Sequence, residues 1–177
     1  LSDWSSDVCS SDLEGSEYSL PMGDGRNDML GEIPYALPGD QRDMTVESIY
    51  EYGSRVGVWR IMEVLSKHKI RGTVALNGEV GTYYPRIMQA MIDLDWELMG
   101  HGLTNSRVLS GLDLETERQV IFDTKKIIEN YGKRMKGWLG PGLTETFNTP
   151  DLLKEAGVEY VADWVNDDLP YRFNNGL

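Results

Sequence analysis

Residues 73–78 read Thr-Val-Ala-Leu-Asn-Gly, and residues 97–102 read Glu-Leu-Met-Gly-His-Gly. Each stretch is a short apolar run that ends in polar residues or glycine, a pattern typical of a buried strand followed by a turn. Residues 85–94, between them, begin with a proline and carry apolar side chains at helical spacing, namely Ile87, Met88, Met91 and Leu94. We therefore predict a strand, a helix and a second strand, which is the order of a parallel βα unit.

The same alternation extends along the chain in both directions. Downstream, apolar spacing predicts a helix, a strand, a helix and a strand, at residues 113–131, 135–140, 149–156 and 158–162. Upstream, residues 45–69 are predicted to form a helix, and residues 14–42, rich in Gly, Pro and Asp, a long irregular loop. Three tryptophans lie in or beside apolar runs and are expected in the core: Trp59, Trp96 and Trp138.

Repeated strand and helix at this spacing predicts an α/β protein with a parallel sheet, either a doubly wound sheet or a (β/α) barrel. The order of the strands cannot be read from the sequence. Asn77, His101 and Asp163 each come just after a predicted strand. Barrels of this kind gather their active sites at the carboxyl ends of their strands, so this placement favours the barrel.

Composition is that of a globular protein. The 177 residues are 40% hydrophobic and 26% charged, and their formal net charge is −12. A strongly acidic chain without a basic cluster repels a phosphate backbone, so we expect no nucleic acid as a partner. No stretch approaches the ~20 apolar residues of a bilayer span, so no membrane partner is expected either.

The first residues differ in character from the rest. Residues 3–13 read Asp-Trp-Ser-Ser-Asp-Val-Cys-Ser-Ser-Asp-Leu, which resembles a translated sequencing adapter and has neither helical nor strand periodicity. We interpret residues 1–13 as a non-native scar, with a native flexible tail as the alternative. Residues 14–177 would then form one partial domain, truncated at both ends and without a thiol, because Cys9 is the single cysteine.

His101 stands between two glycines at a predicted strand end. Its ring can bind a metal ion or transfer a proton near neutral pH, and glycines let a ligand approach closely. A histidine at such a position can equally cap the strand by bonding to a backbone carbonyl. The residue pattern alone favours neither interpretation. The other histidine, His68, lies at a predicted helix end and is given no catalytic role.

Two further segments follow predicted strands. Residues 163–168 read Asp-Trp-Val-Asn-Asp-Asp; their acids could orient a basic side chain and the Trp164 ring could support a sugar or ureide, although the pattern by itself favours a solvated turn. Residues 140–144 read Gly-Pro-Gly-Leu-Thr. Their backbone N–H groups could point towards an oxyanion, or the segment could be a turn with no further role.

Longer strings carry a family resemblance. Residues 47–60, Glu-Ser-Ile-Tyr-Glu-Tyr-Gly-Ser-Arg-Val-Gly-Val-Trp-Arg, and residues 166–171, Asn-Asp-Asp-Leu-Pro-Tyr, resemble the allantoinase-like branch of the polysaccharide deacetylases with NodB homology. The Gly-His-Gly string lies between them, in the order of that family's motifs. The likeness extends over residues 14–173 and implies an incomplete (β/α) barrel of the NodB type.

The resemblance assigns roles residue by residue. Glu14 matches the second acid of the first motif, which often binds the metal, whereas Leu13 stands in place of the first acid, the general base. His101 matches the first histidine of the second motif, and Asn105 stands in place of the second histidine, although an amide is a poor zinc ligand. Gly140 and Pro141 occupy the third motif without its arginine. Asp163 and Trp164 resemble the fourth motif, and the fifth would lie beyond the last residue.

The implied activity is hydrolysis of a non-peptide C–N bond, by attack of water on a carbonyl, in an N-acetyl sugar or a cyclic ureide such as allantoin. The implied catalytic residues are Glu14, His101 and Asp163, and the implied substrate-binding residues are Asn105, Gly140, Pro141, Trp164 and Asp167. The cofactor would be none or a weakly held divalent metal such as zinc, on His101 and Glu14. The allantoinase-like branch also favours a cytoplasmic location.

Two other functions stay open at this point. The first is a catalytically inactive, carbohydrate-binding relative, which the missing arginine and histidine favour. The second is a sugar or phosphate isomerase on a full barrel, which ranks last because the chain has no phosphate-binding loop.

Overall fold

The computed structural model describes residues 52–104, 108–165 and 168–177, so the predicted loop at 14–42 and the first seven residues of the predicted helix at 45–69 lie outside it. Within these ranges, four strands form one parallel sheet: β1 (Thr73–Leu76), β2 (Glu97–Gly100), β3 (Gly137–Trp138) and β4 (Tyr160–Val161). All four predicted strands are confirmed, the last two with shorter bounds.

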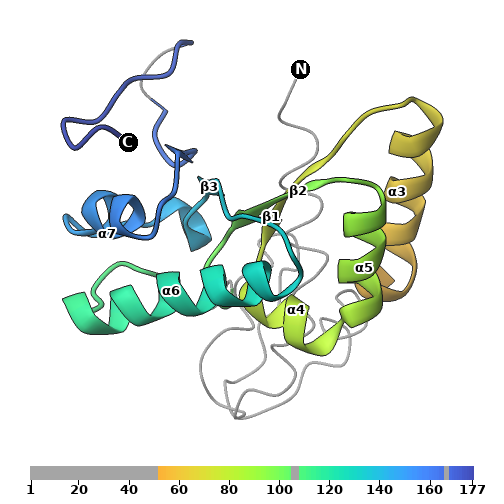
Figure 1. Cartoon of the computed structure of the whole chain (residues 1–177), viewed down its shortest axis with the longest axis horizontal. Helices are drawn as coiled ribbons and strands as arrows, with labels where there is room; N and C mark the ends of the chain where they lie inside the picture. Colours follow the sequence, from red (N-terminus) through yellow and green to blue (C-terminus); the bar gives the residue numbers. More distant parts are fainter. Residues whose placement is uncertain (1–51, 105–107, 166–167) are drawn as a thin grey trace, which may run out of the picture.

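The strands lie side by side in chain order, β1-β2-β3-β4. A doubly wound sheet reverses its strand order at a switch point, whereas a (β/α) barrel adds each strand beside the one before it. The observed order is therefore that of part of a barrel wall. Figure 1 shows the sheet between α3 and α5 at one end and α6 and α7 at the other.

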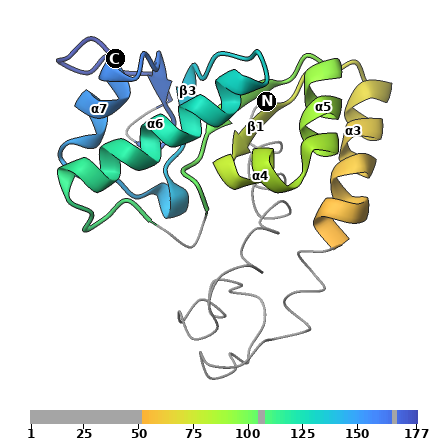
Figure 2. The ribbon, with the colours of Figure 1, turned by 60° about the horizontal axis from the view of Figure 1, so that its bottom comes forward.

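The helices follow the strands in the predicted alternation, and Figure 2 shows them in a row from α7 and α6 at one side to α5 and α3 at the other. Their bounds are α3 Val58–Lys67, α4 Gly78–Tyr83, α5 Pro85–Asp93, α6 Leu114–Asn130 and α7 Thr149–Glu155. None of the helices in the described ranges is long and apolar enough to cross a membrane.

One predicted core residue is wrong. Trp96 and Trp138 are fully buried, but Trp59 is 36% exposed. A π-helix, η2 (Gly53–Gly57), precedes α3, and its wider turn shifts the phase of the helical face. As a result Val58 and Met62, four residues apart, face the core in place of Trp59.

The sequence pattern did not predict α4. Its residues, Gly-Glu-Val-Gly-Thr-Tyr, include two glycines, which disfavour a helix. In the folded protein α4 packs closely on α6, because a Cβ at Gly81 would lie 2.5 Å from the Ile127 side chain. Glycine at this position therefore permits the contact that stabilises the short helix.

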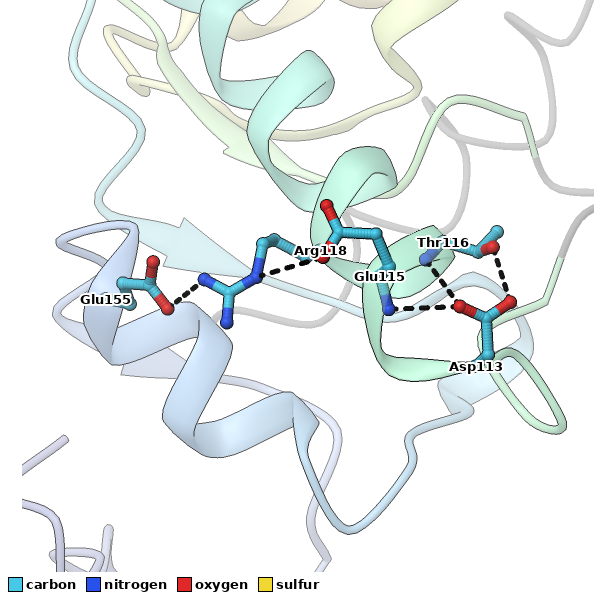
Figure 3. Close-up of polar contacts among 5 residues, drawn as sticks. All are labelled: Asp113, Glu115, Thr116, Arg118 and Glu155. Atoms are coloured by element: carbon cyan, nitrogen blue, oxygen red, sulfur yellow. Dashed lines mark hydrogen bonds and ion pairs between the residues drawn. The ribbon is translucent and has the colours of Figure 1, made fainter.

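The start of α6 is fixed by its cap. The Asp113 side chain accepts hydrogen bonds from the backbone N–H groups of Glu115 and Thr116, at 3.1 and 3.0 Å, and from the Thr116 hydroxyl, at 2.6 Å (Figure 3). These bonds lower the pKa of Asp113, and the bond from the Thr116 hydroxyl has the largest effect. In the same view Arg118 of α6 pairs with Glu155 of α7.

A buried acid also joins α6 to α7. Glu117 has no exposed surface, and its carboxylate accepts hydrogen bonds from the hydroxyls of Thr146, at 2.6 Å, and Thr149. Because a buried carboxylate needs such partners, this cluster fixes the start of α7 relative to α6.

Candidate functional site

The carboxyl ends of the first three strands meet through hydrogen bonds between the segments that follow them. Asn77, directly after β1, donates from Nδ2 to the backbone carbonyl of His101 at 2.7 Å. The backbone N–H of Leu139, directly after β3, donates to the Gly100 carbonyl at 2.9 Å. Residues distant in sequence are thereby brought to one edge of the sheet, as predicted for a barrel.

His101 lies at the centre of this edge and is only 5% exposed. Its Nδ1 lies 2.5 Å from the carbonyl oxygen of Leu139. Because a carbonyl can only accept, Nδ1 carries the hydrogen and donates it, and in the neutral ring Nε2 then holds the lone pair. The predicted bond from His101 to a backbone carbonyl is thus present, and in the neutral ring only Nε2 has the lone pair that binding a metal or accepting a proton requires.

The glycines around His101 lie against other parts of the protein. A Cβ at Gly100 would lie 2.5 Å from the Met135 sulfur and 2.7 Å from the Trp138 ring. Gly102 has a φ of 66°, and a Cβ there would lie 2.7 Å from the Pro141 ring. Both glycines are needed because other parts of the protein pack against them.

Asp163, just after β4, faces the turn that follows β3. Its Oδ1 accepts a hydrogen bond of 2.6 Å from the backbone N–H of Gly140, while its Oδ2 is buried and receives no donor from the part of the chain that the structure describes. Burial, and then the neighbouring Glu145 carboxyl, raise the pKa of Asp163 to about 8, against the lowering effect of the Gly140 N–H. Asp163 therefore does not belong to a solvated turn.

Three of the N–H groups in the turn at residues 140–144 donate to oxygens of the protein itself. Besides the Gly140 N–H on Asp163, the N–H of Leu143 donates to the Gly140 carbonyl at 2.8 Å, and the N–H of Thr144 donates to the Pro141 carbonyl at 3.2 Å. These three donors are used within the protein. A contact of these three N–H groups with a substrate oxygen is therefore not supported, whereas the contact of the Gly142 N–H with an oxyanion stays a prediction.

Trp164 is 55% exposed and is held at two points of its ring. Its Nε1–H donates to Glu145 Oε2 at 2.9 Å, and its ring meets Phe173 edge to face, with 5.5 Å between the centroids. Trp164 also lines a hollow of about 670 Å³ beside β4. The other lining residues are Glu159, Tyr160, Val161, Leu169, Pro170, Tyr171, Arg172, Phe173, Gly176 and Leu177. His101 and Asp163 do not line it.

The structure thus brings His101 and Asp163 together, because both bond to the Leu139–Gly140 segment. Pro141 packs against Gly102 in the same region. Trp164 is bonded to Glu145 of the turn after β3. The other predicted site residues, Glu14, Asn105 and Asp167, lie outside the described residues. Their roles stay predictions, as do the substrate-binding and catalytic roles of the residues that are described.

The described residues do not by themselves fit a zinc ion. Zinc draws on three or four good nitrogen, sulfur or oxygen ligands. Over residues 52–104, 108–165 and 168–177, no three His, Cys, Asp or Glu side chains lie close enough to hold one metal ion. His101 offers Nε2 alone, so a metal here would depend on residues outside the described ranges.

Sequence reasoning missed Glu145. The residue belongs to no motif quoted above, and it lies 18 positions before Asp163. The available signal was its position four residues after the Gly-Pro pair at a strand end, in a turn that returns towards the sheet. An acid there, opposite another strand-end acid, is a candidate for the same site.

Comparison with known proteins identifies the family. The family model described as polysaccharide deacetylase matches residues 39–161. A Schizosaccharomyces pombe protein assigned by its name to the polysaccharide deacetylases is 31% identical over 142 residues, which is 73% of this chain and 42% of that protein.

Solved structures agree with this. The crystal structure of Puue allantoinase has a TM-score of 0.73 and 29% identity over 88% of this chain and 54% of that one. A Pseudomonas aeruginosa PAO1 protein, named as a polysaccharide deacetylase, has a TM-score of 0.73 and 28% identity over 86% and 54%. The chain therefore spans about half the length of these relatives. On the family match, the chain belongs to the polysaccharide deacetylase family of hydrolases.

Proposed function

We propose that the protein hydrolyses a non-peptide C–N bond whose carbon belongs to a carbonyl, in an N-acetyl sugar or a cyclic ureide such as allantoin. The observation that carries the proposal is the set of bonds that places His101 at the carboxyl edge of the sheet, on the same Leu139–Gly140 segment that bonds to Asp163. The name of the structurally similar Puue allantoinase supports a ureide as one of the two substrate classes.

In this proposal water attacks the carbonyl carbon and the C–N bond breaks. His101 Nε2 accepts the proton that the water loses and returns it to the departing nitrogen, so that the products are an acid and an amine or amide. Asp163 was predicted to be catalytic, but its Oδ2, the oxygen that is not bonded to Gly140, is buried. We assign it a positioning role, in which it holds Gly140 and the turn beside His101. A metal bound through His101, Glu14 or other residues would polarise the carbonyl or the water.

The test compares the two substrate classes directly. The resemblance implies that the family has an acid where Leu13 stands, a second group able to accept the proton of the attacking water, so the assay uses the chain with Leu13→Asp beside the unchanged chain. Turnover of allantoin and of N-acetylglucosamine oligomers is measured for both, by release of ureide product and of acetate. We expect turnover of one class, and more of it with Leu13→Asp. Absence of turnover on both substrates, with and without added zinc, would contradict the proposal.

A second candidate is a carbohydrate-binding relative without activity. The observation in its favour is the hollow beside β4, where Tyr160, Trp164 and Tyr171 offer aromatic surface of the kind that sugars stack against. The unchanged chain and the Leu13→Asp chain also distinguish this candidate from the hydrolase. Binding of oligosaccharide by calorimetry without turnover, lost on Trp164→Ala, would favour this candidate over the hydrolase.

A further inference from the structure

Glu145 connects the two residues that follow β4. One of its carboxyl oxygens, Oε2, accepts the indole N–H of Trp164 at 2.9 Å. Trp164 follows Asp163 directly in the chain, and the Glu145 carboxyl is also near enough to the Asp163 carboxyl to raise the pKa of Asp163. A single side chain from the turn after β3 therefore contacts both Asp163 and Trp164.

Each of the two acids has one carboxyl oxygen with a hydrogen-bond donor and one without a donor from the described residues. Asp163 Oδ1 has the Gly140 N–H and Glu145 Oε2 has the Trp164 N–H. The remaining oxygens, Asp163 Oδ2 and Glu145 Oε1, are both buried and neither receives a donor from the described residues. Two ionised carboxylates can only accept hydrogen bonds, so two neighbouring carboxylates in this condition repel each other. One proton between them turns the contact into a hydrogen bond.

Other titratable groups nearby are engaged elsewhere. The His101 Nδ1–H of the segment after β2 donates to the Leu139 carbonyl, and the Tyr160 hydroxyl of β4 donates to Glu97 on β2. Within the described residues no basic side chain is bonded to Asp163 or Glu145, so none of the described cations offsets a second negative charge at this position.

We infer that Glu145 and Asp163 share one proton, and that Glu145 is a positioning residue of the candidate site which ties the turn after β3 to Asp163 and Trp164. The pair then carries one negative charge while the proton is present. Loss of the proton adds a second charge without a counter-ion, which pushes the two carboxyls apart. The turn at Gly140 and the Trp164 ring then lose their common anchor.

This inference concerns the geometry of the site in the proposed hydrolase, but its test needs no turnover. The full chain is labelled with ¹³C at the carboxyl carbons of Asp and Glu and titrated by NMR, with Asp163→Asn used to assign the Asp163 signal. The unchanged protein should give a midpoint near 8 for Asp163. In Glu145→Gln the new amide donates to Oδ2 and removes the negative neighbour. The midpoint should then fall by at least ~1 pH unit.

A matched control and a second signal complete the experiment. Glu63→Gln changes an exposed acid on α3 and should leave the Asp163 midpoint unchanged. In the unchanged protein the indole N–H resonance of Trp164 should move with the same midpoint, and this movement should vanish in Asp163→Asn.

An Asp163 midpoint in the ordinary range near ~4 in the unchanged protein, or one that Glu145→Gln does not move, would overturn the inference. If Glu145→Gln does not fold, as checked by circular dichroism, the titration of the Trp164 resonance with and without Asp163→Asn decides it. Failure of turnover with an intact titration would refute the proposed function alone.

Discussion

At the scale of single residues, the protonation of a side chain depends on its neighbours in the fold and not on its residue type alone. Asp163 resembles a turn residue in the sequence, yet burial and Glu145 raise its pKa to about 8. His101 was open to two interpretations, and the Leu139 carbonyl now fixes which ring nitrogen carries the hydrogen. Both outcomes depend on neighbours from other strands, so single-sequence patterns could name the residues but not their protonation.

Asp163 should make the stability of the protein depend on pH in a specific direction. The folded protein binds the Asp163 proton up to a pH of about 8, whereas the unfolded chain releases it near ~4. Between these values the folded state holds more protons, so this contribution to stability is complete below ~4 and is lost as pH rises towards 8.

The measurement compares urea unfolding of the unchanged protein and of Asp163→Asn at several pH values between 5 and 8. The unchanged protein should lose stability relative to the variant as pH rises. Asp95 and Asp113, whose pKa values are lowered by their hydrogen-bond donors, act in the acid range outside this window. Parallel pH curves for the two proteins would refute the raised pKa.

At the scale of elements, the sequence predicted what periodicity and capping control. Residues 85–94 and 113–131 were predicted as helices and are found as α5 and α6 within one residue at each end. The errors arise where tertiary contacts override local preference. The π-turn of η2 rotates Trp59 out of the core, and α4 forms on two glycines because it packs against α6.

The buried hydrogen bonds of Glu117, which connect α6 to the start of α7, should contribute strongly to the stability of the folded protein. Glu117→Ala removes the acceptor for two hydroxyls in the buried cluster of Thr146 and Thr149. Hydrogen bonds to a charged group contribute about 1.5–3 kcal/mol each, so we expect a loss of roughly 3 kcal/mol in the free energy of unfolding.

The control is Glu115→Ala, on the same helix two residues earlier, where the side chain is 82% exposed. It should cost no more than ~0.5 kcal/mol, as is usual for surface positions. Urea denaturation followed by circular dichroism gives both values. Equal losses for the two variants would show that the buried cluster does not stabilise the α6–α7 contact.

At the scale of the whole molecule, the parallel sheet in chain order and the family match agree with the predicted partial barrel. The sequence favoured this fold because polar residues recur at strand ends. It could not give the strand order, which depends on contacts between strands rather than on any local pattern. It also missed Glu145, because the contact with Asp163 exists only once β3 and β4 are adjacent.

The central claim is that chemistry occurs at the His101 edge of the sheet, and the two histidines of the chain allow a matched test. Turnover of allantoin and N-acetylglucosamine oligomers is measured in the Leu13→Asp chain with His101→Ala or with His68→Ala, the latter changing an exposed residue at the end of α3. The account predicts a loss of at least ~10²-fold for His101→Ala, as expected for a residue that transfers a proton, and a change within about two-fold for His68→Ala. Equal turnover in the two variants would contradict it.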